Sequence, residues 1–104
     1  MSALTFSPAL HPGEVLREEF LAPLNLSAGA LAKRLSVPRT RIERIVNEET
    51  PVSPDTALRL SRALGTTAQF WMNMQAAYDL AKAEAALNDE VRAITLLDEL
   101  SSAH

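Results

Sequence analysis

Two short amphipathic stretches, separated by Ser-Val-Pro at residues 36–38, restrict the fold of this 104-residue chain more than any other feature. The first stretch follows Ser27, a residue type favoured at helix N-caps. The second begins at Pro38, whose missing N–H suits a first helical turn. Both place apolar side chains three and four positions apart, which is the spacing of one helix face. The inward-facing side chains are Leu31, Ala32, Leu35, Val37, Ile42, Ile45 and Val46. The sequence therefore predicts two short helices joined by a tight turn over residues 28–47.

Positional details within residues 28–47 match a helix-turn-helix, the motif that places its second helix in the major groove of DNA. Ala32 lies where the two helices approach most closely and only a small side chain fits. Ser36 stands in the turn where glycine is usual, so this serine must accept an unfavourable backbone or a slightly different turn. The pattern fits a helix-turn-helix at every position considered except this one.

Positive charge is concentrated in the same stretch. The whole chain carries a net charge of -3 at pH 7, yet residues 28–47 hold five basic side chains against Glu43 alone. Residues 48–104 hold four basic and nine acidic side chains. A basic cluster on one element of an acidic protein favours a nucleic-acid ligand. The alternative is that the cluster is only a solvated helix face.

A helix-turn-helix would divide the polar residues of this segment into two groups. Side chains near the start of the second helix would meet base edges, where arginine pairs with guanine and glutamate accepts from cytosine N4. These residues are Arg39, Thr40, Glu43 and Arg44. Flanking polar side chains would hold phosphates, which orient the protein without specifying the sequence. These residues are Ser27, Lys33, Arg34, Arg41 and Asn47.

Three further helices are expected around this motif. Apolar residues at helical spacing predict a first helix over residues 12–21, limited by Pro23. Ser53 is a suitable N-cap for a fourth helix that ends at Gly65. A long fifth helix is expected over about 67–87, and no strand pattern is convincing. The predicted fold is all-α, with five helices.

The long helix carries two apolar stripes that point in different directions. One stripe consists of Phe70, Trp71, Met74, Ala77, Tyr78 and Ala81. The other consists of Met72, Ala76, Leu80, Ala83 and Leu87. A small domain can cover one stripe, so the second predicts a homodimer interface. The alternative is that the tail over 88–104 folds back as a short extra helix, and both arrangements can hold. Residues 1–87 are then the helix-turn-helix domain and 88–104 its tail.

Other classes of protein find little support in the sequence. The chain has no cysteine, and its only histidines, His11 and His104, lie near opposite ends. No catalytic triad, metal-ligand set or glycine-rich phosphate loop is apparent, so neither an enzyme nor a cofactor or metal is expected. The chain shows no signal peptide and no stretch long enough to cross a bilayer, so a cytoplasmic location without a membrane partner is expected.

At this point the chain resembles the HigA-type antitoxins, a branch of the λ-repressor-like (XRE) helix-turn-helix proteins. The matching stretches are HPGEVLREEFLAPLNLS, LAKRLSVPRTRIERIVNEE and VSPDTALRLSRALGTTAQFWMNMQAAYDLAKAE, which cover most of residues 11–84. The run ALRLSRALG followed by FWMNMQAAYDL is specific to this family, whereas the middle stretch alone indicates only the superfamily. The chain departs from the family at Ser36, and at Glu48 and Glu49, where glycine and lysine are frequent. The acidic pair puts phosphate contacts from that loop in doubt.

The resemblance implies a domain that dimerises through its C-terminal half and represses its own operon at palindromic operator DNA. It also implies a HigB-type toxin partner, a small RelE-like ribonuclease that the antitoxin neutralises by forming a complex. Because such toxins are generally basic, Glu14, Glu18 and Glu19 and the acidic tail are the expected docking places. Two alternatives stay open. One is a stand-alone phage-type or restriction-modification repressor without a toxin, and the other is an interaction module that has lost DNA binding.

Overall fold

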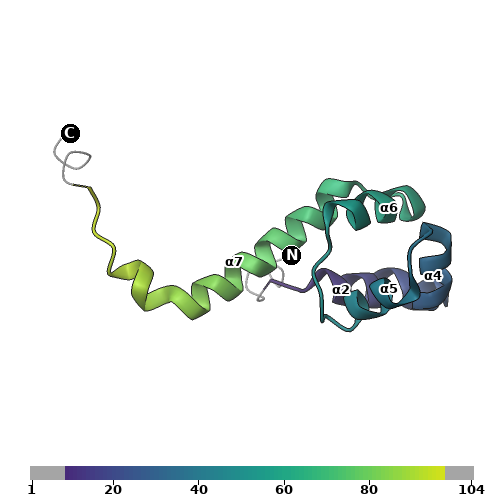
Figure 1. Cartoon of the computed structure of the whole chain (residues 1–104), viewed down its shortest axis with the longest axis horizontal. Helices are drawn as coiled ribbons and strands as arrows, with labels where there is room; N and C mark the ends of the chain where they lie inside the picture. Colours follow the sequence, from purple (N-terminus) through teal and green to yellow (C-terminus); the bar gives the residue numbers. More distant parts are fainter. Residues whose placement is uncertain (1–8, 98–104) are drawn as a thin grey trace.

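The computed structural model describes residues 9–97, and every regular element in that range is helical (Figure 1). The elements are α2 (Pro12–Val15), η1 (Leu16–Leu21), α3 (Ala22–Leu24), α4 (Ala28–Leu35), α5 (Arg39–Val46), α6 (Pro54–Leu64) and α7 (Ala68–Arg92). Because α2, η1 and α3 follow one another without a break, the described part of the chain holds five helices. The predicted all-α fold with a long C-terminal helix is confirmed. No helix within residues 9–97 is long and apolar enough to span a bilayer.

The first helix runs through Pro23, where the sequence predicted that it would stop. It ends at Leu24, and Asn25 then takes a left-handed conformation with φ of 51°. Proline inside a helix lacks an N–H, and its ring collides with the carbonyl four residues earlier. Just before Pro23 the helix widens into the π-helical turn η1, in which the N–H of Ala22 donates to the carbonyl of Arg17. The wider turn relieves that collision and lets the helix continue.

The two helices of the motif form as predicted, with one change at the turn. Ser27 caps α4 by accepting a hydrogen bond from the N–H of Ala30 at 3.0 Å. Ser36 has φ of 59° and ψ of 47°, so this serine does take the conformation that glycine usually supplies. Pro38 is the N-cap of α5 and not its first residue, which corrects the prediction. Its extended ψ of 142° places it outside the helix, while its carbonyl accepts from the N–H of Arg41.

The later helices begin where predicted, but α7 ends beyond the expected position. Ser53 caps α6, Gly65 ends it with φ of 74°, and Thr67 caps α7. The last described helical residue is Arg92, so the beginning of the predicted tail belongs to α7. Residues 94–97 are not helical, so they give no support to a sixth helix, and the rest of the tail lies outside the described residues. Figure 1 shows α7 leaving the other helices and extending away from them.

One apolar core joins all five helices. Trp71 of α7 is fully buried at its centre, and its indole N–H donates to the hydroxyl of Thr66 at 2.7 Å. Gln75, one turn later, is also buried, and its side-chain Oε1 accepts from the N–H of Val52 at 2.8 Å. The inner stripe of α7 therefore includes a polar residue that periodicity did not select. Phe70, which was assigned to this stripe, is 38% exposed.

His11 joins the first helix to α7. Its ring is buried, and its Nδ1 accepts from the N–H of Gly13 at 2.8 Å. The ring also forms a T-shaped pair with the ring of Tyr78, with 4.8 Å between the centroids. Burial lowers the pKa of His11, which favours the neutral imidazole that this cap requires. The sequence interpretation of His11 as a helix-entry residue is confirmed.

Candidate nucleic-acid interface

Helix α5 has one buried face and one polar face. Ile42, Ile45 and Val46 lie in the core, whereas Arg39, Thr40 and Arg44 are exposed. The side chain of Arg39 is 72% exposed, and Glu43 is partly covered beside it. The four residues predicted to meet base edges thus lie on the side of α5 that points away from the core.

Each arginine of α5 has a carboxylate within reach. Arg39 Nε lies 3.1 Å from Glu43 Oε2, and Arg41 lies 3.2 Å from Asp55. Arg44 lies 3.7 Å from Glu49. Exposed pairs of this kind contribute little to folding stability, typically below about 1 kcal/mol, so they do not prevent the guanidinium groups from contacting DNA.

The two neighbouring carboxylates of Glu48 and Glu49 pair with different arginines. Glu48 lies 3.2 Å from the guanidinium of Arg17, whereas Glu49 is near Arg44. Both carboxylates are therefore next to a cation of the protein. This arrangement limits the repulsion that an acidic loop beside a nucleic-acid surface would otherwise cause.

The predicted phosphate-binding residues form separate groups. Ser27 lies at the N-terminus of α4, where free N–H groups and the helix dipole favour an anion. Lys33 and Arg34 are exposed in the last turn of the same helix, about 10 Å away by helix geometry. Asn47 is exposed at the C-cap of α5. The structure does not gather these residues into one cluster.

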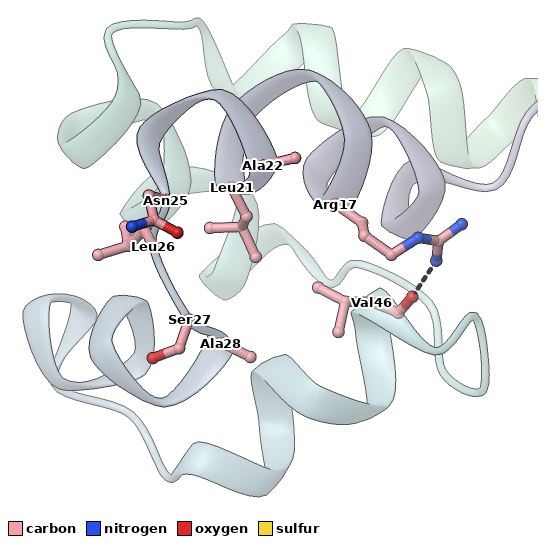
Figure 2. Close-up of a pocket in the computed structure, with 8 residues that line it drawn as sticks. All are labelled: Arg17, Leu21, Ala22, Asn25, Leu26, Ser27, Ala28 and Val46. Carbon is pink, nitrogen blue, oxygen red and sulfur yellow. Dashed lines mark hydrogen bonds between the residues drawn. The ribbon is translucent and has the colours of Figure 1, made fainter.

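Two arginines outside the motif hold its helices in place, and the sequence interpretation did not identify either. Arg59 of α6 donates to the carbonyl of Leu35 at 2.7 Å and pairs with Asp55 at 2.7 Å. The hydrogen bond from Arg59 lowers the pKa of Asp55. Arg17 of η1 donates to the carbonyl of Val46 (Figure 2). The last turns of α4 and α5 are thus each capped by an arginine that is distant in sequence.

Gly13 brings the first helix against the backbone of α5. A Cβ at this position would lie 1.7 Å from the carbonyl oxygen of Ile45. Gly13 and Arg17 therefore act on consecutive carbonyls, those of Ile45 and Val46, at the end of the candidate recognition helix. Figure 2 shows Arg17 reaching from the first helix across to this turn.

The other predicted surfaces are only partly as expected. Glu18 and Glu19 are exposed, Glu14 is half-buried, and Glu18 pairs with Arg17 at 2.9 Å. Of the predicted dimer face, Ala76, Leu80, Ala83 and Leu87 are exposed. Met72 is partly buried and packs against the core of its own chain. Within residues 9–97 no group of three potential metal ligands occurs.

The sequence of this chain is similar to those of known helix-turn-helix proteins. The helix-turn-helix family model matches residues 16–71. Virulence-associated protein I of Dichelobacter nodosus is 60% identical over 77 residues, which is 74% of this chain and 71% of that protein.

Two solved structures share both fold and sequence with this chain. The Pseudomonas aeruginosa antitoxin HigA with the higBA promoter has a TM-score of 0.83 and 44% identity, covering 86% of this chain and 98% of that one. The antitoxin GraA in complex with its operator has a TM-score of 0.82 and 44% identity, covering 88% and 93% respectively.

Proposed function

Because this chain belongs to the helix-turn-helix family, in the branch that holds the HigA-type antitoxins, we propose that it binds operator DNA as a homodimer and represses its own operon. The observation that carries this proposal is the exposed basic face of α5, opposite a face buried in the core. Two structures of similar chains contain promoter or operator DNA, which supports the same use of α5 here.

Sequence reading belongs to the polar face of α5. Helix α5 enters the major groove, where Arg39 and Arg44 pair with guanines and Thr40 contacts a thymine methyl group. Glu43 is close enough to Arg39 to share its carboxylate between that arginine and a cytosine amino group.

Phosphates on either side of the groove are held by the second group of residues. Ser27 and the N-terminus of α4 bind one backbone, and Lys33, Arg34, Arg41 and Asn47 supply further contacts. A two-fold dimer of this motif reads a palindrome whose half-site centres lie about 34–36 Å apart.

Replacing Arg39 and Lys33 separately by alanine tests this division of roles. Arg39→Ala should cost about 1–3 kcal/mol of discrimination at one base pair of each half-site. Lys33→Ala should weaken binding to all sequences alike and reduce the slope of log K against log salt by about 1. Titrations on operator variants at several salt concentrations measure both effects. Identical behaviour of the two variants would contradict the assignment.

We further propose that the chain neutralises a HigB-type ribonuclease toxin, as its membership in the antitoxin branch suggests. The exposed carboxylates of the first helix, Glu18 and Glu19, with the half-buried Glu14, are the proposed contact for a basic toxin. They lie on an element separate from α5, so toxin and operator need not compete for the same side chains.

Co-expression with the product of the reading frame beside this gene tests the toxin partner, and the proposal expects that product to be a small basic protein. We expect growth rescue and a stable complex that co-purifies. Changing the three glutamates to lysine should then weaken the complex at least about tenfold, since rim charges govern association. Glu84→Lys, a charge reversal at an exposed position of α7 outside the proposed dimer stripe, is a single-site control. Operator binding without any toxin complex would favour the stand-alone repressor instead.

A further inference from the structure

We infer that Gly29 is a specificity-determining residue. The absence of a side chain at Gly29 lets the stem of Arg39 cross the first turn of α4, and Glu43 of α5 then holds the guanidinium of Arg39 for base reading. This inference rests on the proposed function and deepens it. It assigns a role in reading DNA to a residue that carries no functional group of its own.

The first observation is the space above Gly29. A Cβ at Gly29 would lie 2.8 Å from Arg39 Cδ, 3.5 Å from Cγ and 3.9 Å from Nη1. The aliphatic stem of Arg39 therefore runs directly over this turn of α4. Gly29 lies inside α4, without the positive φ that would itself call for glycine. The requirement at this position is thus room for Arg39, and not backbone freedom.

The second observation is the ion pair on the other side of the same side chain. Glu43, one turn further along α5, holds Arg39 Nε at 3.1 Å. The two terminal nitrogens of the guanidinium remain available, and they are a donor pair suited to the O6 and N7 of guanine. The stem is thus placed by α4 and the head group by α5.

Arg39 differs from Arg44, the other proposed base-reading arginine, in having a shorter ion pair and a stem that runs over a neighbouring helix. The ion pair of Arg44 is with Glu49, on the loop that follows α5, and is 3.7 Å long. A side chain ordered before binding loses less conformational freedom when it meets its base. Recognition of the base pair that faces Arg39 should therefore depend on the shape of α4 as well as on the arginine itself.

Gly29→Ala tests the inference because its effects on folding and on recognition should run in opposite directions. Alanine forms helix better than glycine, and only a side chain has to move aside. The thermal midpoint should therefore be equal to the wild-type value or higher. Operator affinity should nevertheless fall about five- to twentyfold. Discrimination between bases should be lost only at the base pair that Arg39 reads. Ala63→Gly, at an exposed position of α6 that the proposal does not place against DNA, is the control: the midpoint should fall and the affinity should not change.

A double-mutant cycle and a measurement on the free protein decide the outcome. In an Arg39→Ala background, Gly29→Ala should produce no further loss of affinity, because the two residues act together. An equal loss in both backgrounds would overturn the inference, as would an unchanged affinity in the single variant. The order of the Arg39 Nε–H group, measured by NMR without DNA, should exceed that of the exposed Arg62 and should fall in Gly29→Ala. If Arg39 and Arg62 were equally ordered, the inference would be refuted whether or not the protein binds an operator. If Arg39 were the more ordered but the wild-type protein bound no operator, only the proposed function would be refuted.

Discussion

Replacing Gly13 with alanine should lower the free energy of unfolding by about 3 kcal/mol or more, the upper part of the range for overpacked sites. The added Cβ would lie 1.7 Å from the carbonyl oxygen of Ile45 and 2.8 Å from its carbon. Both atoms belong to the backbone of α5, so no side-chain rotation can remove the collision. The first helix and α5 must separate, and the thermal midpoint should drop by about 12 °C or more.

The other two glycines provide a graded comparison. Gly65 has φ of 74° and no atom within 4 Å of a Cβ built on it, so Gly65→Ala should cost only the left-handed strain of about 1 kcal/mol. Gly29→Ala should cost nothing in stability. Urea unfolding of the three variants measures the series. A cost for Gly13→Ala no larger than that for Gly65→Ala would show that the first helix does not approach α5 so closely.

Changing Leu80 and Leu87 together to aspartate should reduce operator affinity about 10²- to 10⁴-fold. In the proposed dimer these side chains pair the two protomers, and losing the link between two half-site contacts removes that much avidity. Leu80 is 60% exposed and Leu87 46% exposed in the single chain, so neither supports its own core. Further along the chain, exposed apolar residues continue as far as Leu97, and they add to the apolar surface that a partner could cover.

Sedimentation equilibrium and titration on full and half operators measure this second effect. The double variant should be monomeric and should bind a half-site as well as the wild-type protomer does. Leu58→Asp, at a position 62% exposed on α6, is the control and should leave the dimer intact. A double variant that remains dimeric would place the interface elsewhere. Met72 is left out because it packs against its own core.

Local signals in the sequence predicted the helix boundaries well wherever a boundary depends on a nearby side chain. Ser27, Ser53 and Thr67 each cap a helix by accepting an N–H three residues later, an interaction contained within one turn. The errors at Pro23 and at the end of α7 have a different origin. Proline's effect depends on whether the helix can widen before it, and the length of α7 is not fixed by any local stop signal.

Only part of the candidate site could be predicted, because the sequence signals used are local. Periodicity identifies which side of α5 faces outward, but it carries no information about contacts between distant segments. Arg17 and Val46 are 29 residues apart, and Arg59 and Leu35 are 24 apart. Gly29 acts through Arg39 on the neighbouring helix, so its role is visible only once both helices are placed. Met72, which the sequence placed on the outer stripe, also packs against the core of its own chain, because periodicity separates the faces of a helix without showing how far the core reaches around it.

The length of α7 has a consequence for the rotation of one protomer relative to the other. This single uninterrupted helix packs on the domain at Trp71 and Gln75 and presents its proposed dimer face from Ala76 to Leu87. One residue added to a helix turns everything beyond it by about 100°. An insertion between these two stretches would thus swing the two recognition helices out of phase with successive turns of DNA. In the proposed dimer, α7 therefore sets the angle between the two protomers as well as the distance between them.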